Sequence, residues 1–455
     1  MTLSESSTRH VLLSRIRQRR AQVCVVGLGY VGLPLAVEMA AVGFDVLGID
    51  VSAEKVQAIR EGRSYIRDVA PRHVAAVVKS GRLSASLDFQ RVEGADVIFI
   101  CVPTPFTGTR APDLSYIVAA TEEIAKRLHG GQLVILQSTT YPGTTEEVVL
   151  PILERTGLKV GSDFFLAFSP ERINPGDREH NVRNTPKVTG GVTPDCTELA
   201  RVLLEQLTAE VFVVSSPRAA EMTKLLENIF RSVNIALVNE LALLSERMGI
   251  DLWEVIAAAS TKPFGFMPFY PGPGVGGHCI PVDPYYLLWK AREYDFHTKF
   301  IELAAEVNQD MPYHVVDRVV EGLNSRSKAL HGARILLLGV AFKADVDDAR
   351  NSPAQRIVEL LVGRGACVCY NDPYIPRFEA GRDVFIRQEI VLESVDLTPE
   401  ELQQADCVVI VVGHSCYDWD WVVGHSSLIV DAVNATRDVS AGKERIIRIG
   451  ANETR

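Results

Sequence analysis

The stretch Gln22-Val-Cys-Val-Val-Gly27-Leu-Gly29-Tyr-Val-Gly32-Leu-Pro34 decides the fold of the first half of the chain. A short β-branched run precedes glycines at the spacing G-x-G-x-x-G, and Pro34 lies in the first turn of an amphipathic segment. This order predicts a strand, a tight turn and a helix, which together bind the pyrophosphate of a dinucleotide. Asp50 ends the next predicted strand, where its carboxylate can accept hydrogen bonds from both ribose hydroxyls. Because that carboxylate would repel a 2′-phosphate, we expect NAD rather than NADP as the cofactor.

Further residues are expected beside this cofactor. Lys55 follows Asp50 and either reaches the pyrophosphate or pairs with Asp50. Thr104 and Thr139 come just after later strands, whose carboxyl ends form the crevice of an open α/β sheet. Taken alone, either threonine could also be an ordinary turn residue. The predicted cofactor contacts in this half are Gly27, Gly29, Tyr30, Val31, Gly32, Asp50, Lys55, Thr104 and Thr139.

The rest of the chain alternates in the same way on both sides of a helical block. Strands are predicted at 23–26, 46–49, 97–102, 133–136, 164–168, 211–214, 335–338, 367–370, 407–412 and 428–430. Helices are predicted at 221–248, 252–259, 285–293, 299–322 and 353–364. The fold class is therefore α/β, with two Rossmann-like doubly wound domains joined by a central helical domain. The expected divisions are a basic extension (1–20), an NAD-binding domain (21–214), a helical dimerisation and catalytic domain (215–325) and a second Rossmann-like domain (326–455).

Composition excludes several classes of protein. A length of 455 residues is too great for one core, and 47% apolar with 23% charged residues is typical of globular proteins. A net charge of −10 argues against non-specific nucleic-acid binding. The chain has no apolar run long enough to cross a membrane, and its first residues lack the apolar core of a signal peptide. Eight cysteines without paired spacing fit free thiols in the cytoplasm. We expect the basic first segment to be a solvated helix or tail.

Cys279 is the predicted nucleophile. It lies in a glycine-rich loop, Pro271-Gly-Pro-Gly-Val-Gly-Gly-His-Cys-Ile-Pro-Val-Asp283, just before a helix that Pro284 begins. Free amides at a helix start favour a thiolate. A zinc site is not expected, because no second ligand pair accompanies His278 and Cys279. A hydride acceptor combined with a nucleophilic thiol suggests oxidation through a covalent thioester.

Four polar residues are candidates for the same chemistry. Lys224 and Asn228 are four residues apart on the long predicted helix and project from one face, although a lysine there could also be a snorkelling surface residue. Glu171 lies just beyond a strand and is a candidate base for activating water. Asp283, four residues after Cys279, is the second carboxylate.

Five motifs in order resemble the UDP-glucose/GDP-mannose dehydrogenase family. They are Gly27-Leu-Gly-Tyr-Val-Gly-Leu-Pro34, Ser169-Pro-Glu-Arg172, Glu221-Met-Thr-Lys-Leu-Leu-Glu-Asn228, Gly276-Gly-His-Cys-Ile-Pro-Val-Asp283 and Gly339-Val-Ala-Phe-Lys343 with Asp348-Ala-Arg350. The Ser-Pro-Glu-Arg form and the segment 262–274 are similar to the branch that acts on UDP-N-acetylhexosamines, especially UDP-N-acetylglucosamine.

The resemblance implies a two-step, four-electron oxidation of the sugar C6 hydroxymethyl to a carboxylate with two NAD. Cys279 would form the thiohemiacetal and thioester, Lys224 and Asn228 would stabilise oxyanions, Asp283 and Glu171 would handle protons, and Thr139 would orient water or substrate. The expected substrate contacts are Glu171, Arg172, Lys224, Asn228, Tyr270, Gly276, Gly277 and Lys343, which would contact the diphosphate. Arg350 would reach the cofactor, and the chain would form a homodimer through the central helices.

One departure from the family concerns the sugar and the base. Relatives often have Asp-Thr-Arg-Asn near the final strand, where this chain has Asp431-Ala-Val433-Asn434, and Arg437 could supply the missing charge. dTDP-glucose and UDP-glucose therefore stay open as substrates beside an acetamido sugar. Two other functions also stay open: that of a two-electron dehydrogenase of the hydroxyacid or 6-phosphogluconate type, and that of a non-catalytic nucleotide-sugar sensor.

Overall fold

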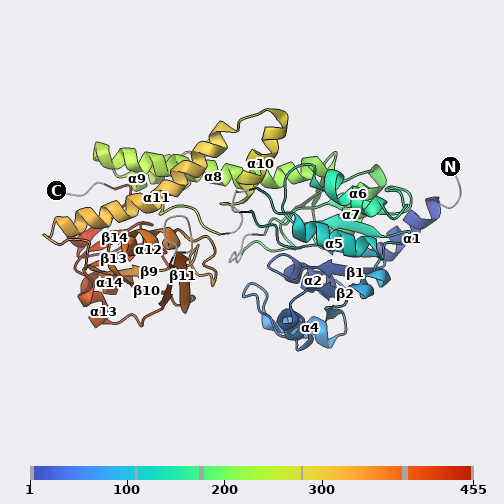
Figure 1. The fold of residues 1–455 in the computed structure, drawn as a ribbon, viewed down its shortest axis with the longest axis horizontal. Coiled ribbons are helices and arrows are strands. Elements are labelled where there is room, and N and C mark those ends of the chain that lie inside the picture. Colours follow the sequence, from blue (N-terminus) through green and yellow to red (C-terminus); the bar gives the residue numbers. More distant parts are fainter. Residues whose placement is uncertain (1–4, 108–110, 174–178, 278–279, 382–387, 452–455) are drawn as a thin grey trace. The chain divides into compact units, whose positions relative to one another are not determined.

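The structure is a computed structural model that describes residues 5–107, 111–173, 179–277, 280–381 and 388–451. The described chain forms two compact units. Unit 1 contains the residues up to Glu227 together with Tyr285–Phe296, and unit 2 contains Asn228–Pro284 and the residues from His297 onward. Figure 1 shows that each unit has a sheet with helices beside it, as the predicted α/β class requires.

Unit 1 is built on an eight-stranded sheet of order β3-β2-β1-β4-β5-β6-β7-β8. All of its strand pairs are parallel except β6 with β7, which are antiparallel. The strands are β1 Gln22–Val26, β2 Asp45–Ile49, β3 Leu83–Ser86, β4 Val97–Ile100, β5 Leu133–Leu136, β6 Phe165–Phe168, β7 Lys187–Gly191 and β8 Val211–Val213. The six strands predicted for this region are present, whereas β3 and β7 were not predicted.

Side chains alternate between the two faces of this sheet, so both faces are covered. Val23 and Val25 belong to a core that includes residues of α2 and α7, and Cys24 and Val26 belong to a core with residues of α5. The helices are α1 Glu5–Arg17, α2 Gly32–Ala41, α3 Ala53–Arg60, α4 Pro71–Lys79, α5 Ser115–Ala125, α6 Leu150–Glu154 and α7 Pro194–Leu204, with short turns η1 Phe89–Gly94 and η2 Thr145–Val149. Two faces packed with helices define a doubly wound domain.

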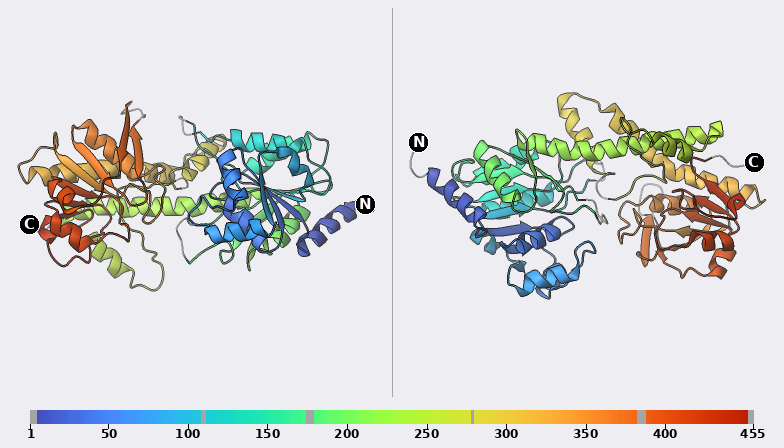
Figure 2. Two further views of the ribbon diagram at one scale, coloured as in Figure 1. Left: turned by 90° about the horizontal axis from the view of Figure 1, so that it is seen from below. Right: turned by 180° about the vertical axis from the view of Figure 1, so that it is seen from behind.

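The first helix corrects the expectation of a solvated N-terminal segment. Leu12, Leu13 and Ile16 of α1 are buried in the unit 1 core, and α1 packs on α7. Arg9 is paired with Asp195 and with Glu198 on α7. The blue helix at the N end in Figure 2 is α1. Its apolar residues are too few to dominate a sequence pattern, yet they suffice to bury one face of a short helix.

Unit 2 repeats the plan on a smaller parallel sheet of order β10-β9-β13-β14-β15. The strands are β9 Arg334–Leu338, β10 Cys367–Asn371, β13 Cys407–Ile410, β14 Ile429–Asp431 and β15 Ile446–Arg448, and β11 Arg377–Gly381 pairs with β12 Glu389–Glu393 as an antiparallel pair. Leu337 and Leu336 face opposite cores, one with α11 and α12 and the other with α13 and α14. This second Rossmann-like sheet confirms the predicted fold class, although β11, β12 and β15 were not predicted.

Helices fill the middle of the sequence, as predicted. They are α8 Pro217–Met248, which continues from unit 1 into unit 2, α9 Leu252–Ala259, α10 Asp283–Ala291 and α11 Lys299–Asn324. Unit 2 also contains α12 Pro353–Gly363, α13 Pro399–Gln404 and α14 Trp419–His425, and the short turns are η3 Arg292–Tyr294 and η4 Lys443–Arg445. Among the described helices, none has both the length and the apolar character needed to cross a bilayer.

Candidate active site

The glycine loop after β1 has the shape that a pyrophosphate requires. Gly27 has φ +92°, and a Cβ atom there would lie 2.6 Å from the carbonyl oxygen of Cys101. At Gly32 a Cβ would lie 1.8 Å from the Gly27 oxygen, so only glycine allows this turn to pack against α2. A Cβ on Gly29 would meet nothing within 4 Å, which leaves room for a ligand. Helix α2 has no side-chain cap on its N-terminus. Its first amides therefore suit an anion, and the loop fits a dinucleotide.

Asp50 is buried at the end of β2 and is held in place by the backbone. Its Oδ2 accepts a hydrogen bond from the Leu28 amide at 2.8 Å, and its Oδ1 accepts one from the Ser52 amide at 2.9 Å. Lys55 Nζ lies 3.4 Å from Asp50 Oδ2, so of the two predicted roles for Lys55 the structure displays the pairing with Asp50. Each carboxylate oxygen keeps acceptor capacity for a ribose hydroxyl.

Thr104 and Thr139 follow the adjacent strands β4 and β5 and contact each other. Thr104 Oγ1 donates a hydrogen bond to the Thr139 carbonyl at 2.7 Å. Tyr286 of α10 in turn donates a hydrogen bond to the Thr104 carbonyl. The two threonines are thus brought together at the carboxyl edge of the unit 1 sheet, where the open α/β plan places ligands.

Glu171 is buried and accepts hydrogen bonds from four donors. The Arg172 and Ile173 amides bond to Oε1 at 2.8 and 3.1 Å, and Gln137 Nε2 and Lys187 Nζ each lie 2.9 Å from Oε2. Burial pushes the pKa of Glu171 upward, but the Lys187 charge and the hydrogen bonds outweigh it and hold the pKa below its ordinary value. Sequence reasoning missed Lys187, although a lysine at the start of a buried strand signals a buried counter-charge.

Arg172, a predicted substrate contact, is bonded inside unit 1. Its guanidinium lies 2.7 Å from Glu227 Oε1 and donates a hydrogen bond to the Pro186 carbonyl at 2.7 Å. A substrate anion would have to share this arginine with Glu227.

Helix α8 carries three buried polar residues at its start: Glu221, Lys224 and Asn228. The side chain of Lys224 is only 7% exposed, so the reading as a snorkelling surface lysine is wrong. Glu221 is fully buried and accepts hydrogen bonds from the Gly143 amide, the Thr145 amide and the Thr145 hydroxyl at 2.5, 2.9 and 2.6 Å. Burial raises the pKa of Glu221 to about 7 against those hydrogen bonds. Glu221 is a further buried titratable group that sequence reasoning passed over.

In unit 2, Asn228 and Asp283 are joined. Asn228 Nδ2 donates a hydrogen bond to Asp283, and both residues are almost wholly buried. Arg231 donates a hydrogen bond to Asn228 Oδ1 at 2.5 Å, which sets the orientation of the amide. Asp283 is the first residue of α10, four residues after Cys279. Cys279 itself lies outside the described residues.

The glycine loop before Cys279 is held by the segment after β9. The Gly277 amide donates a hydrogen bond to the Arg350 carbonyl at 3.0 Å, and Asn351 Nδ2 donates one to the Gly277 carbonyl at 3.0 Å. A Cβ on Gly276 would lie 2.8 Å from Cβ of Phe342. Tyr270 is half exposed and stacks on Trp253 with ring centroids 5.9 Å apart. A side chain at Gly276 would collide with Phe342, and Gly277 has φ +89°, so both positions favour glycine.

Lys343 lines a pocket of about 530 Å³ in unit 2. Val433 and Arg437 line the same pocket, so the arginine that could replace the missing family charge shares a pocket with Lys343. The guanidinium of Arg437 lies 3.1 Å from Asp438 and is 71% exposed. Arg350, predicted to contact the cofactor, is paired with Asp348 at 2.6 Å.

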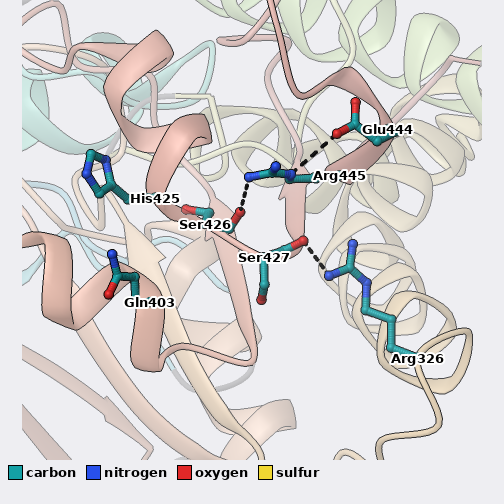
Figure 3. A pocket seen from close by; sticks show the side chains of 7 residues that line it. All are labelled: Arg326, Gln403, His425, Ser426, Ser427, Glu444 and Arg445. Atoms are coloured by element: carbon teal, nitrogen blue, oxygen red, sulfur yellow. Dashed lines mark hydrogen bonds and ion pairs between the residues drawn. The ribbon is translucent and has the colours of Figure 1, made fainter.

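A second pocket of unit 2, of about 470 Å³, is lined by Arg326, Arg445 and His425 among other polar residues. Figure 3 shows that Arg326 points to the Ser427 carbonyl, and that Arg445 lies between the Ser426 carbonyl and Glu444. Both arginines are thus bonded to the protein itself. Within the described ranges, no group of three or more His, Cys, Asp or Glu side chains could hold a metal ion.

Comparisons with known proteins identify relatives over almost the whole chain. Three models of the UDP-glucose/GDP-mannose dehydrogenase family match: the NAD binding domain at residues 21–208, the central domain at 218–310 and the UDP binding domain at 336–438. The UDP-N-acetyl-D-glucosamine 6-dehydrogenase of Pseudomonas aeruginosa is 42% identical over 79% of this chain and 84% of its own length. The UDP-N-acetyl-D-mannosamine dehydrogenase of Pyrococcus horikoshii is 36% identical over 92% of this chain and 97% of its own length.

Solved structures agree with this assignment. The structure of UDP-D-ManNAc dehydrogenase from Pyrococcus horikoshii has a TM-score of 0.86 at 33% identity and covers 95% of this chain and all of that chain. An NDP-N-acetyl-D-galactosaminuronic acid dehydrogenase from Methanosarcina mazei has a TM-score of 0.80 at 31% identity, with 99% of both chains covered.

Proposed function

The chain belongs to the UDP-glucose/GDP-mannose dehydrogenase family and is an NAD-dependent oxidoreductase acting on CH–OH groups, and we propose that it oxidises C6 of a UDP-N-acetylhexosamine to a carboxylate. The names of the relatives support an acetamido sugar, because they act on UDP-N-acetylglucosamine or UDP-N-acetylmannosamine. The observation that carries the proposal is the buried hydrogen bond from Asn228 to Asp283, the residue four positions after Cys279.

We propose that the cofactor is held by the loop 27–32 and by Asp50. The uncapped amides of α2 and the open space at Gly29 suit the pyrophosphate, and Asp50 suits the ribose hydroxyls. Bound NAD would accept a hydride from C6 in each of the two oxidations. Thr104, Thr139 and Arg350 are proposed to border the cofactor.

The two oxidations need a covalent step between them, for which we propose Cys279. Its thiolate adds to the C6 aldehyde and forms a C–S bond, giving a thiohemiacetal. Loss of a hydride converts this into a thioester, and water then attacks the carbonyl carbon, the C–S bond breaks, and the carboxylate leaves with the thiolate restored. Lys224 and Asn228 are proposed to donate hydrogen bonds to the oxygen on C6 whenever it becomes negative. Glu171 and Asp283 are proposed to accept the protons.

We propose that the nucleotide diphosphate binds in the Lys343 pocket of unit 2. Lys343 and Arg437 supply positive charge there, and Val433, at the position where the family resemblance implies an arginine, contributes an apolar side chain to the pocket. Because the charge near Val433 comes from Arg437 instead, a thymine nucleotide stays among the substrates to be tested.

We also propose a homodimer through α8. Phe230, Leu237, Leu241, Leu244 and Met248 are exposed large apolar residues at helical spacing along one side of α8. A second copy of the chain is the occupant best suited to such a stripe, because the stripe is part of a long helix that can pair with its own equivalent. Replacing Leu241 and Leu244 by Glu should shift the mass in light scattering from dimer to monomer, whereas the matched exposed change Val391→Glu should not.

We infer a cytoplasmic location as well. The described cysteines are free thiols, which fits a reducing compartment.

The stoichiometry of NADH release tests the function. Purified protein is mixed with NAD and, separately, with UDP-N-acetylglucosamine, UDP-N-acetylmannosamine, UDP-glucose, GDP-mannose and dTDP-glucose. The proposal expects two NADH per sugar with a UDP-N-acetylhexosamine. One NADH per substrate would favour the two-electron dehydrogenase, and no NADH with any sugar, despite tight NAD binding, would favour the sensor.

A further inference from the structure

The contacts of Glu171 extend to a second strand of the sheet. Glu171 follows β6, and Lys187 is the first residue of β7, which pairs antiparallel with β6. Ser169 donates a hydrogen bond to the Val188 carbonyl at 2.8 Å, and Thr189 donates one to the Phe168 carbonyl at 3.0 Å. These bonds hold the segment that carries Glu171 next to β7. The backbone of β7 therefore places Lys187 where its ammonium group can reach Glu171.

Lys187 and Glu171 form a buried ion pair. Lys187 is 3% exposed, and its Nζ lies 2.9 Å from Glu171 Oε2. Gln137 donates the second hydrogen bond to the same oxygen. Cys101 Sγ lies 3.7 Å from Gln137 Oε1 as a donor, which leaves the Gln137 amide nitrogen to face Glu171. The orientation of Gln137 is therefore fixed from both ends.

The other groups near Glu171 do not replace this charge. The guanidinium of Arg172 is bonded to Glu227 and to the Pro186 carbonyl, and only its amide bonds to Glu171. Burial raises the pKa of the Cys101 thiol, so Cys101 stays neutral. A buried carboxyl that loses its counter-ion takes up a proton, because low dielectric penalises the charged form.

We propose that Lys187 is a positioning residue that, together with Gln137, keeps the Glu171 carboxylate ionised and in one orientation for hydrolysis of the thioester. This inference rests on the proposed function. In the step concerned, the water oxygen bonds to the thioester carbon, the C–S bond breaks, and a proton passes from water to Glu171 and then to solvent. A carboxylate already paired with Lys187 stays ready for that proton at low pH, although it is a weaker base than an unpaired buried carboxylate.

A merely structural ion pair makes a different prediction from a positioning pair. Loss of a pair that is only structural lowers kcat by a similar factor at every pH at which the protein stays folded. Loss of a pair that maintains the charge of Glu171 changes the pH at which activity appears, because Glu171 then has to be deprotonated without help.

The first experiment compares Lys187→Met with Lys187→Arg in the full-length enzyme. For Lys187→Met we expect the acid limb of the kcat profile to move up by at least about one pH unit, since the paired charge is lost. At a pH above the new limb, kcat should recover to within roughly threefold of the original. Lys187→Arg keeps the charge and should restore most of the limb. A uniform loss of kcat with an unmoved limb would overturn the inference, as would no change at all.

Intact-protein mass measurement locates the affected step. During turnover at low pH, Lys187→Met should accumulate enzyme that carries the sugar nucleotide on a cysteine, because hydrolysis is the slow step. The original enzyme should accumulate less. Accumulation equal to that of the original enzyme, with slower first hydride transfer, would contradict the assignment of Lys187 to hydrolysis.

The second experiment needs no activity. Thermal stability is followed from pH 5 to 8 for Lys187→Met and for the double variant Lys187→Met/Glu171→Gln. The unpaired carboxyl of the single variant has a raised pKa, so its contribution to stability falls as pH rises, whereas the double variant has no such group. We expect the single variant to be increasingly less stable than the double variant with rising pH. Parallel curves would overturn the claim that Lys187 maintains the charge. If the original enzyme releases no NADH with any sugar nucleotide but these curves diverge, the proposed function fails while the ion-pair effect stands.

Discussion

Asn228 on α8 donates a hydrogen bond to Asp283 at the start of α10, and both residues are buried. The bond connects a residue of the long central helix with the residue that ends the cysteine loop, 55 positions along the chain. An amide that donates to a carboxylate has its own oxygen free for a second donor, and Arg231 occupies it. The amide nitrogen and carboxylate are therefore held in one arrangement before any substrate binds.

Removal of the Asp283 charge should impair chemistry more than folding. In Asp283→Asn the new amide keeps the size of the side chain, and its oxygen still accepts from Asn228. We expect kcat to fall by roughly two orders of magnitude, as for loss of a general base, with a small change in melting temperature. The matched control is Asp251→Asn, which removes a carboxylate paired with Arg448 in the same unit. Equal losses of kcat in both variants would speak against a role in proton transfer.

Replacement of Cys279 by Ser should abolish turnover and retain substrate binding. Only the covalent step depends on the thiol, so the second oxidation and steady turnover to two NADH per sugar should stop, while binding of the nucleotide sugar, measured by calorimetry, stays within a few-fold of the original. Cys367→Ser, which changes an exposed free thiol at the start of β10, serves as the control. Undiminished turnover in Cys279→Ser would contradict the thioester mechanism.

Arg437 should contribute to substrate binding and not to the chemical step. Its side chain lines the pocket that contains Lys343, so Arg437→Ala removes positive charge from the proposed diphosphate site. We expect KM for the nucleotide sugar to rise roughly tenfold with kcat unchanged, the pattern of lost uniform binding. Arg437→Lys should lie in between, and the exposed change Arg364→Ala should have no effect. An unchanged KM would place the diphosphate elsewhere.

Glu221 should make stability depend on pH in a defined window. Burial raises its folded-state pKa to about 7, above that of the unfolded chain, so the folded protein holds an extra proton between about pH 4.5 and 7. The contribution of Glu221 is complete below that window and is lost as pH rises through it, by up to about 3 kcal/mol.

Glu221→Gln removes this titration, so melting temperature measured from pH 4.5 to 8 should change less steeply in the variant. Glu240→Gln, at an exposed position of α8, provides the comparison. If melting temperature changes with pH equally steeply in the original protein and in Glu221→Gln, Glu221 does not titrate in this window. Its three hydrogen-bond donors would then have lowered its pKa by stabilising the carboxylate.

Most of the fold was predictable from local patterns. Buried parallel strands appear as continuous apolar runs, and helices appear as periodic ones, so α9 was predicted to the residue at 252–259. Strands β3 and β7 were missed for a physical reason: β3 contains two serines in four residues, and β7 contains Lys187 and two glycines. Their strand conformation comes from pairing with neighbouring strands and not from their own composition.

Several candidate site residues were equally accessible to sequence reasoning. The glycines of the loop 27–32, Asp50, Lys224 and Asn228 occur in short motifs whose chemistry depends on spacing along the chain. Asp50, Lys224 and Asn228 are all buried in the structure. Lys187, Gln137 and Glu221 were assigned no role from sequence, because the hydrogen-bond partner of each is between 16 and 78 residues away.

By itself, the sequence determined that two nucleotide-type sheets flank a helical block, and that a dinucleotide loop and a cysteine loop occur in one chain. Short-range sterics and the alternation of apolar residues encode these features within a few neighbouring positions. Only the tertiary structure decided that β7 runs against β6 and brings Lys187 to Glu171, that α1 buries its apolar face on α7, and that Asn228 bonds to Asp283. Such pairings depend on strand order and helix packing, and local periodicity in the sequence does not encode either of them. A buried charge needs a partner, which the fold supplies from a distant part of the chain.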